Sequence, residues 1–323
     1  MTRTFAMCLF VVSAMLLCAC DGAVSMLPKS GGRPYEVLVV ASGNVVSHQL
    51  DSVLSQDVAG LPQSEPMFDV SVTDSLHFNQ AAKLARNIVI LTVNPAVFTS
   101  VKIRYEKNVW AKPQMVAYVN APSAAAVVQA APLIGRRLAD LFTRAEMNVE
   151  IARLAESNNA KAAAAVDTVL GCSIRIPADM KYGKNDDGFL WFSDNAASGM
   201  QNICVYSYPG DSLDPARAVV TRDSVMRRAI PGERRGMYMR TVGGSARCTL
   251  STEKGRTLMI CRGLWEMHGD AMGGPFVSHS VADTARRRIV VAEAFVYAPE
   301  MKKRNLMRQA EAALYTLKVN GGE

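Results

Sequence analysis

The chain has 323 residues, of which 49% are hydrophobic and 20% are charged, and its formal net charge is +7. These fractions are typical of globular proteins and exclude a disordered, fibrous or low-complexity chain. Lys and Arg are scattered in short clusters rather than gathered in one stripe, which disfavours nucleic acid as a partner. The length predicts two domains of ordinary size behind a short targeting segment.

The N-terminal segment has the pattern of an export signal. Its apolar run FAMCLFVVSAMLL (residues 5–17) has the length of a signal-peptide core and is too short to span a bilayer. Cys20 follows a leucine three positions earlier, Leu17, and a small residue directly before it, Ala19. This is the pattern of a bacterial lipoprotein signal, which is cut just before a cysteine that carries diacylglycerol. We therefore expect lipidation at Cys20.

This signal predicts where the protein resides. We expect a signal peptide over residues 1–19 and a tether over residues 20–33, with the protein lipid-anchored in the cell envelope and facing the periplasm. An ordinary secretory signal cut near the same place is the alternative. The leaflet, inner or outer membrane, stays open. The expected partners are the membrane, through the lipid, and an envelope protein or glycan.

The exported part of the chain keeps four cysteines, Cys172, Cys204, Cys248 and Cys261. In the stretch CTLSTEKGRTLMIC, a two-residue turn at positions 254–255 would set Cys248 directly opposite Cys261. Hydrogen-bonded and non-hydrogen-bonded residue pairs alternate along an antiparallel ladder, and counting outward from the turn makes the two cysteines a non-hydrogen-bonded pair. The Cα atoms of such a pair lie about 4.5 Å apart. A disulfide bridges such a distance, and an oxidising compartment permits it. Two free buried thiols are the alternative, and the other two cysteines pair only if their strands are neighbours.

The first half of the chain alternates strand and helix patterns. Short apolar segments predict strands at residues 35–41, 67–72, 87–93, 101–105 and 114–119. Helical spacing predicts a helix at residues 44–58, a long helical region around residues 138–149 and an Ala-rich helix at residues 159–170. Helices packed on a central sheet are the economical interpretation, so we expect an α/β-type domain over residues 34–168.

The second half has a different order of elements. Strands are predicted at residues 172–176, 189–192 and 203–208, and Asp214 followed by Pro215 is a strong helix start. Several strands follow between residues 237 and 297, and an apolar stripe predicts a terminal helix over residues 299–317. We expect an antiparallel sheet with packed helices over residues 169–323. The overall fold class is α+β.

Two resemblances rest on particular segments. The opening IRIPADM (residues 174–180), the strand-rich middle and the terminal amphipathic helix resemble the Mog1/PsbP-like fold. The whole chain is similar to a family of uncharacterised bacterial lipoproteins that carry a domain of unknown function. The segments with that similarity are the lipobox, LPKSGGRPYEVLVV (residues 27–40), NVWAKPQ (residues 108–114) and GLWEMHGDAMGGPFVSH (residues 263–279). The resemblance implies an envelope location but no activity and no catalytic residue.

Familiar catalytic signatures are absent from the sequence. It contains no phosphate-binding loop, no H-E-x-x-H, no G-x-S-x-G and no Gly-rich dinucleotide fingerprint, so no cofactor and no metal are predicted. Catalytic groups assembled by the fold are not excluded by this, because a triad depends on geometry rather than on spacing.

The segment at residues 262–280 has the densest set of reactive side chains. Glu266, His268 and Asp270 alternate and would share one face of a strand, and His279 would return beside them if the two flanking strands pair. Carboxylates and imidazoles at this density suit a divalent metal or acid–base chemistry. The alternative is a wide hairpin with a polar solvent face.

Glu293 is a further catalytic candidate, because it shares a strand face with apolar residues in IVVAEAFVY. If that face is the core, the carboxylate needs a partner such as an arginine. The candidates for ligand binding are side chains that suit glycans and peptides, Trp110, Lys112, Gln114 and Trp265. We expect a non-enzymatic binding or accessory module. The alternative is an envelope hydrolase or metal-dependent enzyme that uses Glu266, His268, Asp270 and His279.

Overall fold

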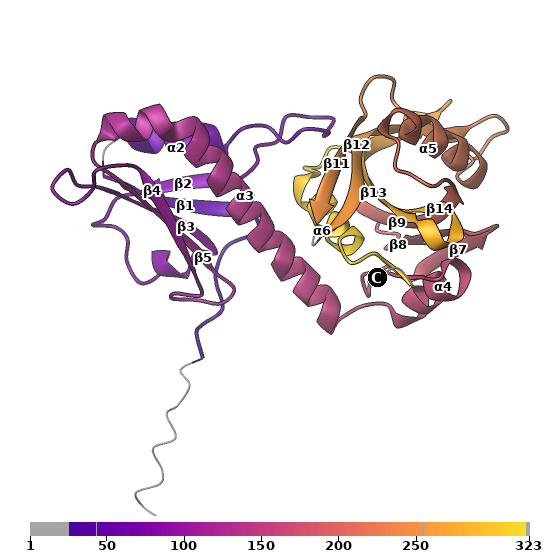
Figure 1. The fold of residues 1–323 in the computed structure, drawn as a ribbon, viewed down its shortest axis with the longest axis horizontal. Helices are drawn as coiled ribbons and strands as arrows, with labels where there is room; N and C mark the ends of the chain where they lie inside the picture. The colour runs from indigo at the N-terminus through magenta and orange to yellow at the C-terminus, as the bar shows by residue number, and fades with distance from the viewer. Residues whose placement is uncertain (1–25, 43, 254, 321–323) are drawn as a thin grey trace, which may run out of the picture.

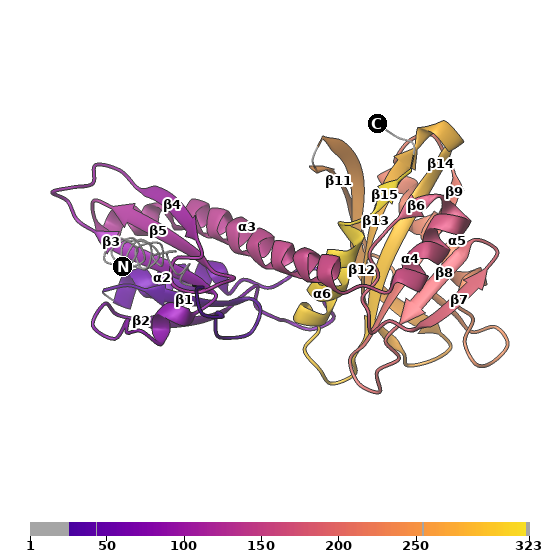
Figure 2. The same cartoon turned by 90° about the horizontal axis from the view of Figure 1, so that it is seen from below.

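The computed structural model describes residues 26–42, 44–253 and 255–320, and Figure 1 shows that they form two units. The predicted signal peptide and Cys20 lie outside the described residues. Figure 2 shows the two units side by side, with helix α3 (Ala124–Glu156) running from one toward the other. No helix within the described residues is both long and apolar enough to cross a membrane.

The N-terminal unit is built on one five-stranded sheet. Its elements are β1 (Glu36–Val40), α2 (Asn44–Leu54), β2 (Asp69–Thr73), the 3-10 helix η1 (Ala82–Leu84), β3 (Asn87–Val93), β4 (Lys102–Lys107), β5 (Met115–Ala121) and α3. The strand order is β2-β1-β3-β5-β4. All pairs are parallel except β4, which lies antiparallel to β5 at the edge. The α/β-type sheet expected from the alternation of patterns is therefore present.

The two faces of this sheet are covered differently. One face packs against α2 and α3, with Val39, Leu50 and Phe142 fully buried in a shared cluster. The other face has no helix of its own among the described residues and is covered by connections, where Phe78 and Trp110 pack against Ile88. Strand β4 lies at the edge of the sheet, beside β5, and its Ile103 is partly buried against the cluster under α2 and α3.

Helix α3 connects the two hydrophobic cores. It begins at Ser123, whose hydroxyl accepts a hydrogen bond from the Ala126 amide at 3.1 Å and so caps the first turn. With 33 residues it is about 50 Å long. Its first turns pack on the N-terminal sheet, whereas Met147 and Leu154 belong to the core of the C-terminal unit. One continuous helix therefore sets the spacing of the two units.

The C-terminal unit is an antiparallel sheet that curls between helices. Its elements are α4 (Ala160–Leu170), β6 (Cys172–Ser173), β7 (Tyr182–Asp186), β8 (Phe189–Ser193), β9 (Met200–Pro209), α5 (Pro215–Ala229), β10 (Tyr238–Thr241), β11 (Arg247–Glu253), β12 (Arg256–His268), β13 (Gly273–Asp283), the 3-10 helix η2 (Thr284–Arg286), β14 (Arg288–Tyr297), α6 (Arg304–Leu314) and β15 (Lys318–Val319). The main strand order is β10-β12-β13-β14-β9-β8-β7, with β11 paired to β12, and β6 and β15 form a separate small ribbon. The fold class is mixed α+β, as expected.

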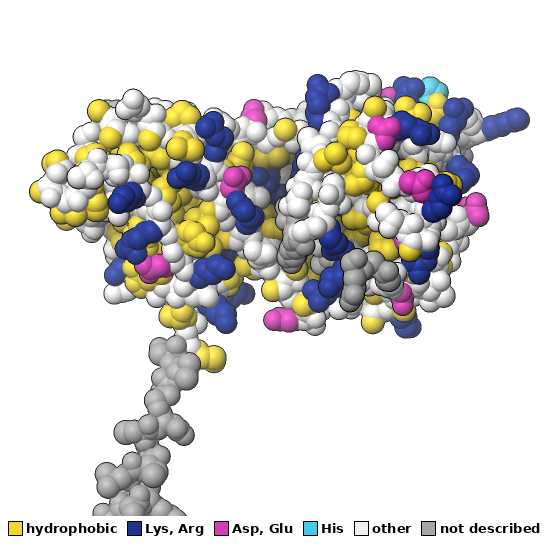
Figure 3. Space-filling model, in the orientation of Figure 1, with side chains coloured by type: hydrophobic (Ala, Val, Ile, Leu, Met, Phe, Trp, Pro, Cys, Tyr) yellow, Lys and Arg dark blue, Asp and Glu magenta, His cyan; other side chains and the backbone are white. Residues whose placement is uncertain are grey.

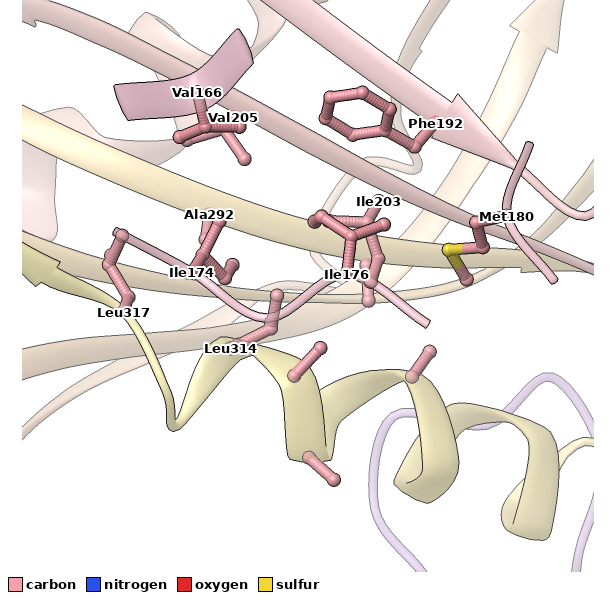
Figure 4. Packing of buried hydrophobic residues seen from close by; sticks show 14 of the residues in the cluster. Val166, Ile174, Ile176, Met180, Phe192, Ile203, Val205, Ala292, Leu314 and Leu317 are labelled. Atoms are coloured by element: carbon pink, nitrogen blue, oxygen red, sulfur yellow. The ribbon is translucent and has the colours of Figure 1, made fainter. Parts of the chain in front are cut away.

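The helices of this unit lie on opposite faces of the sheet. Helix α5 packs one face through Met226. Helices α4 and α6 pack the other, and Figure 4 shows Val166 from α4, Val205 from β9 and Leu314 from α6 in this single cluster. A domain boundary at residue 168, as expected from the sequence, would place most of α4 in the N-terminal domain. The structure places α4 with the C-terminal core, because its apolar stripe faces that sheet.

The hairpin formed by β11 and β12 has the register expected from its turn. Glu253 pairs with Arg256, so Cys248 lies opposite Cys261, with a Cα–Cα distance of 4.0 Å and a disulfide between them. Cys172 and Cys204 lie on strands that are not neighbours and are buried free thiols. Burial raises the pKa of the Cys172 thiol to about 11, so that thiol stays protonated and unreactive at neutral pH.

Candidate binding groove

A groove between β4 and α3 has a volume of about 590 Å³. It lies where the edge strand β4 and its neighbour β5 meet α3, which packs on β5. Apolar and aromatic side chains from both elements form its floor, namely Ile103, Tyr105, Leu141, Ala145 and Val149. Tyr105 is 58% exposed, which is unusual for a large ring on a strand. We call this cavity the β4–α3 groove.

Four cationic side chains line the β4–α3 groove, Arg86, Lys107, Arg137 and Arg144. Arg86 is neutralised by Glu146, since its Nε lies 3.1 Å from Glu146 Oε1. The other three form no ion pair with any described carboxylate, and Lys107, Arg137 and Arg144 are all exposed. Figure 3 shows this kind of surface on the N-terminal unit, where hydrophobic side chains lie among Lys and Arg with few acidic groups.

Glu146 has a structural role at the back of the groove. It is buried, and besides Arg86 it accepts a hydrogen bond from Asn87 Nδ2 at 2.8 Å. Asn87 also donates to the Glu36 carbonyl, which ties the start of β3 to β1. Hydrogen bonding to Glu146 raises the pKa of the Arg86 guanidinium. The carboxylate is thus held by two partners and is not free to act as a base.

The loop NVWAKPQ lies at one end of the groove and is organised by Gln114. Its amide nitrogen donates to the Lys83 and Ala85 carbonyls, both at 2.7 Å, and its oxygen accepts from the Trp110 amide at 2.9 Å. Gln114 is buried, so this predicted binding residue lines the groove but its polar atoms are already used by the loop. Its side chain sets the shape of the groove rather than its selectivity.

The two other predicted binding residues on this loop lie elsewhere. Trp110 is half-buried on the opposite face of the sheet, with its ring edge-on to Phe78 at 5.6 Å, and is a packing residue. Lys112 is exposed beside the segment by which the chain enters the unit. Trp265, the fourth candidate, is 2% exposed in the C-terminal core, where its indole donates to the Val296 carbonyl at 3.2 Å.

The predicted acid–base cluster does not assemble. Strands β12 and β13 pair as expected, but Glu266 lies opposite Gly273 whereas His279 lies opposite Ile260. His279 is therefore six positions from Glu266 along the ladder, a separation of about 20 Å. The expectation that His279 returns beside the others is wrong. Strand β13 begins at Gly273, opposite Glu266, so His279 lies six residues further along β13, away from the turn.

Each member of that cluster has another neighbour. Glu266 pairs with Arg240 at 2.7 Å, the His268 ring lies 5.0 Å from the Tyr238 ring, and Asp270 accepts the Ala271 amide within the turn. His279 is buried 3.4 Å from Glu311. Among the residues that the structure describes, no three His, Cys, Asp or Glu side chains converge as metal ligands.

Glu293 is fully buried and has the arginine partner that burial requires. The Arg222 guanidinium, from α5, approaches Glu293 at 2.7 Å and also donates to Thr241 Oγ1 at 3.0 Å. It stacks on the Phe276 ring, with its Cζ atom 3.8 Å from the centroid. Desolvation raises the pKa of the Glu293 carboxyl, and attraction to Arg222 opposes that rise. A cavity beside Arg222 has a volume of only about 10 Å³, which is too small for a substrate.

Sequence reasoning missed a group of residues where the two units meet. Glu65, from the connection between α2 and β2, accepts hydrogen bonds from the Lys303 amide at 2.6 Å and the Arg304 amide at 3.0 Å. It therefore caps α6 across the boundary. Arg304 also pairs with Asp69 at 2.6 Å, and Arg308 stacks on Tyr35. The sequence signal for this contact was the start of α6, where three basic residues stand and no side chain of the segment itself caps the helix. A helix start of this kind needs a cap from elsewhere in the chain.

Comparisons with known protein families divide the chain at the boundary between the two units. The family model described as domain of unknown function (DUF8532) matches residues 30–155, and domain of unknown function (DUF4837) matches residues 159–316. The division falls between the end of α3 and the start of α4. A search of the curated proteins finds no match to the chain. These findings fit an uncharacterised family and assign no activity to either unit.

Proposed function

We propose that this protein is a lipid-anchored binding module of the cell envelope, and that the β4–α3 groove holds an anionic amphipathic ligand. The Leu17–Ala19–Cys20 pattern supports the anchor, and a periplasm-facing position follows from it. The proposal includes a Mog1/PsbP-like fold for the C-terminal unit. Its support is the antiparallel sheet with α5 on one face and α6 on the other.

The composition of the groove carries the proposal for the ligand. Small-molecule sites are mostly apolar concavities of about 300–1,000 Å³ with a few placed polar groups, and a groove of about 590 Å³ is of that size. An apolar floor suits a hydrocarbon or ring system. Cations without a carboxylate partner suit a phosphate, sulfonate or carboxylate group, to which arginine binds in a bidentate manner.

The test uses the anionic fluorophore anilinonaphthalene sulfonate as the probe and dodecyl phosphate as the competitor. The protein is the chain of residues 21–323, which keeps every described residue and needs no detergent. We expect saturable binding of one probe, displaced by dodecyl phosphate but not by neutral dodecyl maltoside. Replacing Arg137→Gln together with Arg144→Gln removes two charge-assisted contacts and should weaken binding at least about tenfold.

The matched control is Arg136→Gln with Lys102→Gln, which changes the net charge equally on the same unit but outside the groove lining. Its affinity should equal that of the unmodified protein. Equal weakening in both variants would show a general charge effect. Unchanged affinity in the groove variant would exclude the β4–α3 groove as the site.

A further inference from the structure

The N-terminal segment of the described chain is fastened to the same end of the sheet at which the groove opens. The Lys112 amide donates to the Pro28 carbonyl at 2.8 Å, and the Ser30 amide donates back to the Lys112 carbonyl at 3.3 Å. The Gly31 amide donates to the Leu84 carbonyl at 2.7 Å. Residues 28–31 thus run as an added strand-like segment held by backbone hydrogen bonds, and Met26 and Leu27 directly precede it.

Basic and apolar side chains gather along this segment. Lys29 and Lys112 are bridge partners, and both are exposed. Met26 is 89% exposed and Leu27 is 38% exposed. The segments brought together here (residues 26–32, 82–86 and 107–114) contain no Asp or Glu. We call Met26, Leu27, Lys29 and Lys112 the N-terminal patch. Figure 3 shows hydrophobic and Lys or Arg side chains where the described chain begins.

The patch lies within a short reach of the proposed anchor. Cys20 precedes Met26 by six residues, which span at most about 20 Å when fully extended. Lys107, Pro113 and Arg86, which line the β4–α3 groove, belong to or border the same segments. A surface that holds the acyl chains of Cys20 would therefore meet the N-terminal patch first, with the groove beside it.

We propose that the N-terminal patch docks on anionic phospholipid headgroups of the bilayer that holds the anchor, so that the groove opens toward the membrane. This inference rests on the proposed lipidation of Cys20. The two lysines are attracted to the negative surface potential, and Met26 and Leu27 enter the boundary between headgroups and acyl chains. Each lysine near an anionic surface strengthens partitioning about fivefold.

The experiment measures cosedimentation of residues 21–323, which lack the anchor, with vesicles of phosphatidylcholine with or without phosphatidylglycerol. We expect binding only when phosphatidylglycerol is present, and weaker binding at high salt. Lys29→Gln with Lys112→Gln should lower the partition coefficient about 25-fold. The control, Lys161→Gln with Lys318→Gln, removes two exposed lysines from the C-terminal unit and should have no such effect.

Absence of binding to the anionic vesicles, or equal losses in both lysine variants, would overturn the proposed docking. The anchor is tested separately by fatty-acid labelling of the full chain in cells, which Cys20→Ala should abolish. Because the vesicle assay uses a chain without the anchor, loss of labelling and loss of docking are independent results. Labelling without docking would leave the anchor intact and refute only the patch.

Discussion

The core of the C-terminal unit and the groove of the N-terminal unit use charged side chains in opposite ways. In the C-terminal unit the buried cation Arg222 faces Glu293, and the buried Glu311 faces Arg262. In the N-terminal unit, by contrast, Arg137 and Arg144 line an open groove without a carboxylate partner among the described residues. These buried charges are paired within the fold, as Arg86 and Glu146 are in the N-terminal unit. In the groove, Arg137 and Arg144 remain available for a ligand.

The largest effect on stability should come from breaking the buried pair of the C-terminal unit. Glu293→Gln leaves the buried Arg222 with only the partly exposed Asp223 carboxylate, 3.3 Å away, as a counter-charge, and removal of the buried partner of such a pair costs about 3–5 kcal/mol. The measurement is the free energy of unfolding in urea. The control is Glu266→Gln, which breaks a half-exposed pair and should cost about 1 kcal/mol or less. An equal loss of unfolding free energy in the two variants would contradict the stronger stabilising role given to the buried pair.

The next effect concerns the contact between the units. Glu65→Ala removes the carboxylate that caps α6, and loss of such a cap should lower the free energy of unfolding by about 1–2 kcal/mol. Amide hydrogen exchange should accelerate at the first turn of α6 more than elsewhere. Glu156→Ala, an exposed helical glutamate without an ion pair to any described side chain, serves as the control. Unchanged exchange at Lys303 and Arg304 would contradict the capping role.

The last effect is a pH dependence that originates at Glu311 and is absent at neutral pH. Burial alone would raise the pKa of this carboxyl, but Arg262 and the hydrogen bonds from His279 and Arg262 hold it well below its usual range. A carboxyl whose pKa is lowered in the folded state contributes stability above its unfolded pKa of about 4.5, and that stability is lost as the pH falls.

The unfolding free energy should therefore decrease below pH about 4.5, by at most about 1.4 kcal/mol per pH unit from this group. In Glu311→Gln the slope should be shallower by that contribution. Urea titrations between neutral pH and the acid limit provide the measurement. A slope that is identical in both proteins would show that Glu311 titrates normally.

The sequence was most informative where structure depends on neighbours along the chain. The apolar run at residues 87–93 coincides with β3, Asp214 accepts the Ala216 amide at 2.9 Å at the predicted start of α5, and the turn after Glu253 sets Cys248 opposite Cys261. Periodicity, capping and turn chemistry act over a few residues. For that reason they can be read without the fold.

The site depended on contacts that no local pattern encodes. The sequence indicated that a buried Glu293 needs an arginine, but Arg222 lies 71 positions away on α5. Glu65 meets Lys303 across 238 positions. The groove itself is lined by residues of β4 and α3, and α3 is positioned by its packing in both cores. The predicted acid–base cluster does not form, because side chains on one face of a sheet meet only where the register of the two strands sets them opposite each other.

The most direct test of the central claim is methyl NMR of residues 21–323 titrated with dodecyl phosphate. The account predicts that the methyl signals of Ile103, Leu141 and Val149 shift with one saturating binding curve. The methyl signals of Ile174 and Leu314, buried in the C-terminal core, should stay in place. Shifts confined to the C-terminal unit, or no saturable shift at the groove, would contradict the proposal that this groove is the binding site.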